Sequence, residues 1–240
     1  MSNVLSNLKP EALWRHFESI CNVPHPSKHE AALSNFIVDF AKKINLEVLK
    51  DEVGNILIRK AASKGMENRK TVVLQGHIDM VPQKNSDVQH DFLKDPIKPV
   101  IDGEWVKAAG TTLGADNGIG VAAAMAVLED KSLQHGPIEA LFTIDEETGM
   151  TGAFGLKPNF LKGDILLNLD SEDEGEFFIG CAGGVNTVAQ LKYKNENLPI
   201  NYSAYKIIVT GLKGGHSGID IILGRGNSNK IMNRLLWNCA

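Results

Sequence analysis

The chain has 240 residues, with 25 Lys+Arg against 29 Asp+Glu and a formal net charge of −4. Hydrophobic residues make up 43% and charged residues 22%, which is typical of a globular chain and excludes a disordered one. The mild acidity argues against a nucleic-acid-binding protein, and no apolar run is long enough to span a membrane. Three widely spaced cysteines favour a reducing compartment, so we expect a cytoplasmic protein without a disulfide framework.

The first sixty residues predict two helices and two short strands. Residues 9–23 carry Leu13, Phe17 and Ile20 at helical spacing, and residues 28–43 repeat this pattern. The stretch from Glu47 to Ile58 is typical of two strands joined by a turn at Gly54-Asn55.

Three later segments are short, apolar and rich in β-forming residues, as buried strands are: Thr71–Gln75, Ile138–Ile144 and Asp164–Leu169. An Ala-rich helix, Gly118–Glu129, is expected between the first two. Strands that alternate with helices predict an α/β layer fold.

The pattern changes near residue 186. Val188–Tyr193 and Tyr205–Thr210 alternate like strands of a half-exposed antiparallel sheet, and a last helix is expected over Ser228–Trp237. We therefore expect one domain over residues 1–185 and the beginning of a second, apparently truncated domain over 186–240.

Polar side chains follow each of the three buried strands. His77 and Asp79 come after the first strand, Glu146 and Glu147 after the second, and Asp170 after the third. Because ligands of open α/β sheets bind outside the carboxyl ends of the strands, these groups are expected to converge on one crevice. Asp116, which heads the Ala-rich helix, could join them.

An imidazole and several carboxylates in one cleft are costly to hold together unless a divalent cation neutralises them. Nitrogen and oxygen ligands without a thiolate suit Zn²⁺, Mn²⁺ or Co²⁺, and a carboxylate such as Asp116 could bridge two cations about 3.5–4 Å apart. Since adjacent residues point in different directions, one of Glu146 and Glu147 could bind metal while the other acts as general base. Each feature also has a purely structural explanation: a loop histidine at His77, a helix N-cap at Asp116 and a solvated turn at the glutamate pair. The pattern alone leaves both readings open.

The glycine-rich stretches Gly211–Gly218 and Gly114–Gly120 match neither the P-loop spacing nor the dinucleotide fingerprint. The chain also has no HExxH helix and no G-x-S-x-G elbow. Nucleotide binding and these two hydrolase classes are therefore not expected.

Four motifs, in this order and context, resemble the co-catalytic dizinc metallopeptidases, and among them the bacterial aminoacyl-histidine dipeptidases. The motifs are Gly76-His77-Ile78-Asp79, Gly114-Ala115-Asp116-Asn117-Gly118, Asp145-Glu146-Glu147-Thr148-Gly149 and Asn168-Leu169-Asp170-Ser171-Glu172-Asp173. The resemblance covers essentially the whole chain, which is similar to the amino-terminal half of that family. It implies a three-layer α/β/α catalytic domain with a mixed sheet, followed by the start of an α+β lid or dimerisation domain.

The resemblance also implies a role for each matching residue. His77 and Asp170 would bind one Zn²⁺, Glu147 the other, and Asp116 both, with Co²⁺ or Mn²⁺ as substitutes. Glu146 would be the general base, and Asp79 would orient His77. His216, from the lid, would stabilise the oxyanion, and a loop histidine is its structural alternative. The peptide bond after the bridging aspartate, here Asp116–Asn117, is usually cis in this family.

The implied reaction is hydrolysis of dipeptides with a C-terminal histidine, by a homodimer joined through the lid, with no nucleic-acid or membrane partner. The family's last zinc ligand is a histidine near the end of longer chains, and no histidine follows His216 here. Two alternatives therefore stay open. One is an amidase or deacylase of N-acyl amino acids, and the other is a non-catalytic amino-terminal fragment.

Overall fold

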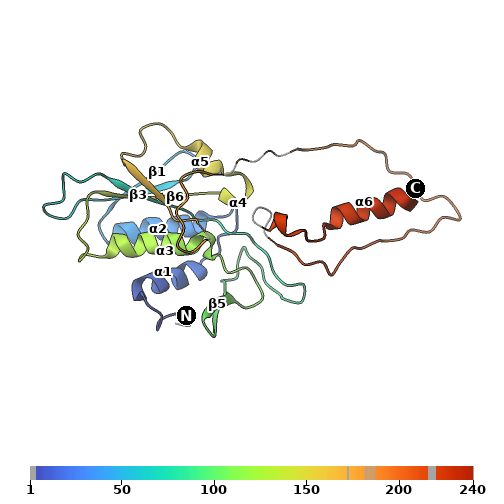
Figure 1. Ribbon diagram of the computed structural model, residues 1–240, viewed down its shortest axis with the longest axis horizontal. Helices are drawn as coiled ribbons and strands as arrows, with labels where there is room; N and C mark the ends of the chain where they lie inside the picture. Colours follow the sequence, from blue (N-terminus) through green and yellow to red (C-terminus); the bar gives the residue numbers. More distant parts are fainter. Residues whose placement is uncertain are drawn as a thin grey trace. The chain divides into compact units, whose positions relative to one another are not determined.

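The computed structural model describes residues 4–171, 173–181, 183, 185, 187–215 and 220–239 (Figure 1). Its contacts divide the chain into two compact units, Met1–Cys181 and Ala182–Ala240. No helix in the described ranges is long and apolar enough to cross a membrane.

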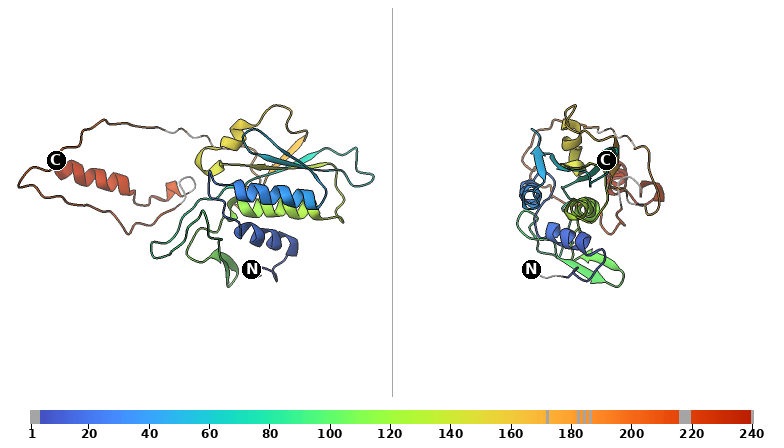
Figure 2. Two further views of the ribbon diagram at one scale, coloured as in Figure 1. Left: turned by 180° about the vertical axis from the view of Figure 1, so that it is seen from behind. Right: turned by 90° about the vertical axis from the view of Figure 1, so that its left-hand side faces the viewer.

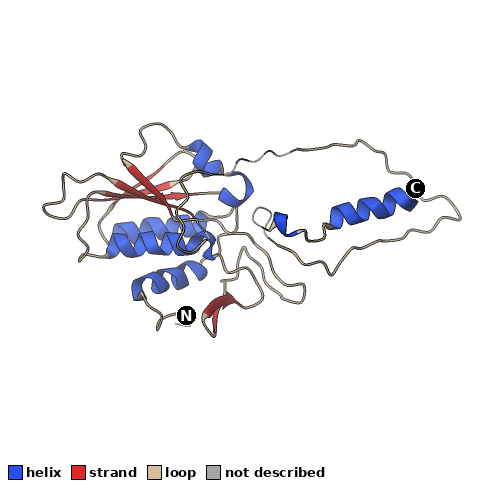
Figure 3. Cartoon of the chain, viewed as in Figure 1, coloured by secondary structure: helices blue, strands red, loops and turns tan. Residues whose placement is uncertain are grey.

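The first unit is built on a five-stranded mixed sheet with the strand order β1-β2-β6-β3-β7 (Figure 3). In that order the strands are Glu47–Lys50, Ile56–Lys60, Ile138–Thr143, Val72–His77 and Ile165–Asn168. Strand β3 runs parallel to both of its neighbours, β6 and β7, whereas β2 runs antiparallel to β6. The α/β fold class with a mixed sheet is therefore confirmed.

Two helices, α2 (Ala31–Lys43) and α3 (Ala115–Glu129), cover one face of this sheet, and a third, α1 (Glu11–Cys21), packs on the outer side of α3, as the views in Figures 1 and 2 show. Apolar side chains from α1 and α3, among them Phe17 and Met125, form one buried core with Ile58 and Phe142 of the sheet. Helix α3 is apolar on most of its surface because it lies between α1 and the sheet.

The opposite face carries a smaller core of Leu57, Val73 and Leu141, against which Leu156 and Phe160 pack. The short helix α5 (Thr151–Gly155) lies on this side, and the short helix α4 (Glu146–Gly149) lies at the end of the sheet (Figure 1). Helix α4 follows directly after β6, so the two glutamates lie at the carboxyl end of this strand.

Strands β4 (Pro99–Asp102) and β5 (Trp105–Ala108) form a separate antiparallel hairpin that the sequence analysis did not anticipate. Its two-residue turn begins at Gly103, whose φ of +62° is a left-handed conformation that glycine adopts without strain. The available turn signal was Gly103, the first residue of the two-residue loop Gly103-Glu104.

Three expectations about strands are wrong: two expected strands are absent, and a third is present but exposed. Val188–Tyr193 and Tyr205–Thr210 contain no strand, and most of their large apolar side chains are more than half exposed, for example Val188 at 79% and Tyr205 at 88%. Alternation alone does not make a strand when no partner strand pairs with it. Strand β7, expected to be buried, lies at the edge of the sheet and exposes Ile165, Leu166 and Leu167.

The second unit contains a 3₁₀ turn, Ile221–Leu223, and helix α6, Ser228–Cys239, which confirms the last helix predicted. Arg225 donates hydrogen bonds to the carbonyl of Gly214 and the carboxylate of Asp220 within this unit. The assignment of this unit to a lid or dimerisation domain stays a prediction.

Candidate metal centre

His77 is the last residue of β3 and is only 1% exposed. Its Nδ1 faces two oxygens of Asp79, the backbone carbonyl at 3.1 Å and Oδ1 at 3.2 Å. Both partners are acceptors, so Nδ1 carries a proton and donates it. This contact fixes the orientation of the imidazole ring and leaves Nε2 facing the other site residues beyond the carboxyl end of β3.

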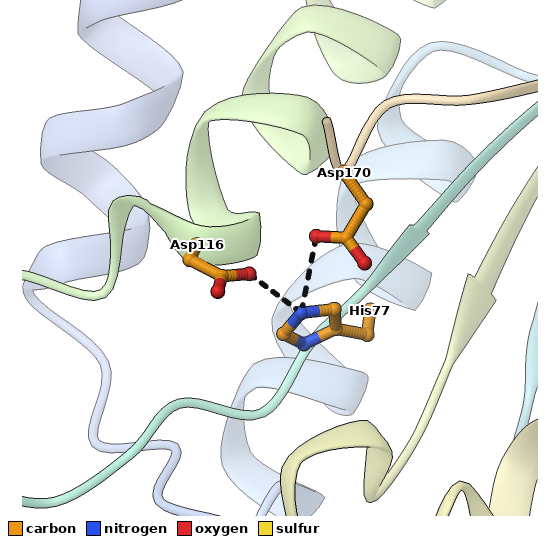
Figure 4. Close-up of side chains that lie close together, drawn as sticks. All are labelled: His77, Asp116 and Asp170. Carbon is orange, nitrogen blue, oxygen red and sulfur yellow. Dashed lines mark hydrogen bonds and ion pairs between the residues drawn. The ribbon is translucent and has the colours of Figure 1, made fainter. Parts of the chain in front are cut away.

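Asp116 and Asp170 approach that Nε2 from two other segments (Figure 4). Oδ1 of Asp116 lies 2.9 Å from Nε2, and Oδ1 of Asp170 lies 3.5 Å from it. Asp116 belongs to the first turn of α3 but has non-helical angles of φ −82° and ψ 109°, and the Asp116–Asn117 bond is cis, as the resemblance implied. Asp170 follows β7.

Glu146 and Glu147 begin α4, directly after a turn at Asp145, whose φ is +49°. Asp79 accepts hydrogen bonds from both backbone N–H groups, with Oδ1 2.9 Å from the nitrogen of Glu146 and Oδ2 3.2 Å from that of Glu147. One buried carboxylate therefore positions the start of α4 and the ring of His77 together. The hydroxyl of Ser27 donates to the same carboxylate at 2.8 Å.

The crowding of carboxylates around one imidazole shifts several pKa values. Burial lowers the pKa of His77, but hydrogen bonds to Asp116, Asp170 and Asp79 outweigh it and raise this pKa to about 12. Burial also raises the pKa of Glu147 to about 7, and Asp116 adds to this effect. The pKa of Glu146 is raised as well, mainly by burial. When no metal ion is bound, the positive charge within the cluster is the imidazolium of His77, which carries a proton on both ring nitrogens.

These residues fit a bound metal. Ligand atoms of His77, Asp116 and Asp170 lie within 4.8 Å of one another, and so do those of His77, Glu146 and Glu147. All are imidazole nitrogens or carboxylate oxygens, the donors that Zn²⁺, Mn²⁺ and Co²⁺ accept. A cation held by the first set would replace the Nε2 proton as the positive charge of the cluster.

A hollow of about 290 Å³ adjoins this cluster and is lined by Asp116 and Glu147 together with Val81, Thr112, Leu113, Gly114 and Ala115. A larger cavity of about 640 Å³ lies around the start of α2, and none of the predicted site residues lines it. A further hollow of about 140 Å³ is lined by Glu146 and Asp170. These two hollows are the ones that adjoin the clustered side chains.

Six of the seven site residues predicted from the sequence thus come together, namely His77, Asp79, Asp116, Glu146, Glu147 and Asp170. His216 lies outside the described residues. The sequence motifs assign no role to Ser27 or Asn117, although Asn117 stands within one of them. Their contacts to Asp79 and Asp170 depend on the folded chain, so no local pattern reports them.

Residues 73–203, more than half of the chain, match the family model described as peptidase family M20/M25/M40. The chain belongs to this family. The matched range includes all six clustered residues, so the family match and the geometry concern the same part of the molecule.

Two relatives of this M20 chain match nearly its whole length. It is 58% identical over 232 residues to the cytosol non-specific dipeptidase of Escherichia coli, covering 97% of this chain and 48% of that protein. The crystal structure of aminoacylhistidine dipeptidase from Vibrio alginolyticus superposes with a TM-score of 0.74 at 54% identity, over 97% of this chain and 47% of that one.

A third solved structure, an aminopeptidase from Bacillus cereus, gives a TM-score of 0.58 at 27% identity, over 68% of this chain and 44% of that one. The chain therefore spans about half the length of the relatives it matches.

Proposed function

We propose that this chain carries the metal-binding and catalytic residues of a peptidase that hydrolyses dipeptides, including those with a C-terminal histidine. The observation that carries the proposal is the convergence of His77, Asp116 and Asp170 with the pair Glu146-Glu147, next to two hollows that four of these residues line. Membership of the M20 family and the names of the two nearly full-length matches support it.

The proposed cofactor is a pair of Zn²⁺ ions, for which Co²⁺ or Mn²⁺ can substitute. His77 and Asp170 would hold one ion, Glu147 the other, and Asp116 both. Bound there, the two ions would lower the pKa of a water molecule and polarise the carbonyl of the scissile bond.

The chain's own groups supply positioning and proton transfer. Asp79 keeps the proton of His77 on Nδ1, so that Nε2 is free to act as a ligand. Glu146 is the proposed general base, which takes a proton from the attacking water and delivers it to the leaving amine. Burial raises the pKa of this carboxyl, which suits a group that must hold and then release a proton.

The proposal also covers the location of the protein, its assembly and the role of one further histidine. We propose a cytoplasmic location, as for the relative named after the cytosol, and a homodimer formed through the second unit. His216 would stabilise the oxyanion of the reacting carbonyl.

The test is hydrolysis of Ala-His by the purified chain with added Zn²⁺, with and without a chelator. Chelator-sensitive turnover is expected, and Glu146→Gln should lower it by about 10²–10⁴-fold while metal still binds. Glu104→Gln, at an exposed position in the β4–β5 turn, is the matched control and should behave like the parent.

Loss of metal in Glu146→Gln would overturn the assignment of the base. No turnover by a folded, metal-loaded chain would refute the activity and favour the non-catalytic alternative. Faster hydrolysis of N-acetyl amino acids than of Ala-His would favour the amidase alternative.

A further inference from the structure

We propose that Asn117 is a positioning residue that holds Asp170 in place as a metal ligand. Positions 76 and 120 are glycine because a side chain at either would collide with the amide of Asn117. This inference rests on the proposed metal centre but not on the proposed reaction. It concerns a side chain that neither binds the metal nor touches the substrate in that proposal.

The amide group of Asn117 joins two segments of the site. Its Nδ2 donates to the carbonyl oxygen of Leu169 at 2.7 Å and to Oδ1 of Asp170 at 2.6 Å. A carbonyl and a carboxylate only accept hydrogen bonds, so the two N–H groups must point at them and the orientation of the amide is fixed by chemistry. The charge on Asp170 makes the second hydrogen bond the stronger one.

The other end of the amide is enclosed. Oδ1 of Asn117 is buried and has no hydrogen-bond partner among the described residues. A Cβ atom added at Gly76 or at Gly120 would clash with this oxygen, and at Gly120 it would also lie 2.8 Å from the carbonyl oxygen of Leu169. The amide therefore occupies a space between β3 and α3 that any side chain at either glycine would fill.

The hydrogen bond from Asn117 reaches the carboxylate oxygen of Asp170 that faces His77. Oδ1 of Asp170, which Asn117 binds, is the same oxygen that lies 3.5 Å from Nε2 of His77. Asp170 follows β7, an exposed edge strand, so the strand itself has little packing to hold this carboxylate. Since Asn117 is also the neighbour of Asp116 in the chain, one residue sets the spacing between two ligands.

The test compares three single variants of the 240-residue chain, Asn117→Ala, Gly120→Ala and Gly118→Ala. The first removes the amide, and the second displaces it while leaving residue 117 unchanged. Gly118→Ala is the matched control, because its Cβ would lie 3.1 Å from the ring of Phe17 and crowds the α1–α3 contact instead. Alanine raises helix propensity at both glycine positions, so propensity does not distinguish these two variants.

The measured quantities are Co²⁺ affinity by competition with a chelator, the visible spectrum of the bound Co²⁺, and urea unfolding of the metal-free chain. Asn117→Ala and Gly120→Ala are expected to bind Co²⁺ about 10–100-fold more weakly and to change its spectrum. Gly118→Ala should keep the parent's Co²⁺ affinity and spectrum, whatever the change in its urea midpoint.

Parent-like affinity in a folded Asn117→Ala or Gly120→Ala would overturn this inference alone, because the amide would then have only a structural role. A parent chain that binds no Co²⁺ would overturn the metal centre and this inference with it. Neither result depends on hydrolysis, so a chain that binds metal and fails to cleave Ala-His leaves this inference standing while it refutes the proposed reaction.

Discussion

Replacing Asp79 by asparagine in the metal-free chain removes one negative charge without changing the shape of the side chain. In the parent, Asp79 is 2% exposed, and its carboxylate accepts four hydrogen bonds, from the ring of His77, the hydroxyl of Ser27 and the N–H groups of Glu146 and Glu147. An amide has one oxygen, so at least one of these donors then faces an N–H group.

The least costly orientation places the new NH₂ group at the Oδ2 position, where the hydroxyl of Ser27 can turn round and accept. The N–H of Glu147 then has no partner, which costs about 1–3 kcal/mol, and the remaining hydrogen bonds lose their charge. A second route gives a similar figure. Burial raises the pKa of Asp79, but hydrogen bonds from His77, Glu146 and Ser27 outweigh it and lower this pKa from 3.8 to about 2, which corresponds to about 2 kcal/mol. We therefore expect a loss of about 2–4 kcal/mol in the free energy of unfolding.

The assay is urea and thermal unfolding, followed by circular dichroism with a chelator present. A loss of this size corresponds to a decrease of roughly 5–15 °C in Tm. Because the folded-state pKa of Asp79 lies below its unfolded value, the carboxylate stabilises the fold above about pH 4 and this contribution is lost as the pH falls toward 2. The difference between parent and variant should therefore shrink over that range.

Ser27→Ala is the graded control, since it removes one of the four donors and should cost about 1 kcal/mol. An Asp79→Asn chain that unfolds at the same urea concentration as the parent at pH 7 would refute the reasoning. It would show that the carboxylate's burial cost cancels all of its hydrogen bonds.

Two further predictions concern the rest of the first unit. Cys21 is 1% exposed, and burial, with a contribution from Glu18, raises the pKa of its thiol to about 12. At pH 8 a thiol reagent should therefore label the exposed Cys181 and Cys239 quickly and Cys21 only after unfolding. Three fast thiols in the folded chain would contradict this. Gly152→Ala should destabilise the chain by about 1–3 kcal/mol in urea, because its Cβ would lie 2.6 Å from the backbone nitrogen of Ile144. Gly180→Ala, where a Cβ would meet nothing within 4 Å, is its control, and an equal effect of the two changes would show that the contact is not responsible.

The sequence was sufficient to predict the elements whose signals are local. The expected strands at 71–75, 138–144 and 164–169 correspond to β3, β6 and β7, and the helices at both ends of the chain are present. The clustering of His77, Glu146 and Asp170 followed from one general rule, that parallel strands end at the same edge of a sheet. This rule holds for any parallel sheet, whatever the packing of its side chains.

What could not be predicted depends on contacts between distant segments. The exposure of β7 follows from its place at the edge of the sheet, which its apolar composition does not reveal. The alternation of Val188–Tyr193 resembles a strand whether or not a partner exists to pair with it. The role inferred for Asn117 requires Gly76, Gly120 and Leu169, which come from three separate parts of the chain.

The position of β6 in the sheet has a consequence for the newly made chain. Strands β2 and β3 follow each other in the sequence, yet in the folded sheet β6 lies between them and pairs with both. Strand β3 therefore has neither of its partners, β6 and β7, when it leaves the ribosome. At a synthesis rate of about 5–20 residues per second, roughly 3–13 s separate the end of β3 at residue 77 from the end of β6 at residue 143. During this interval an apolar strand is without its neighbours, and a chaperone that shields it would be most useful then.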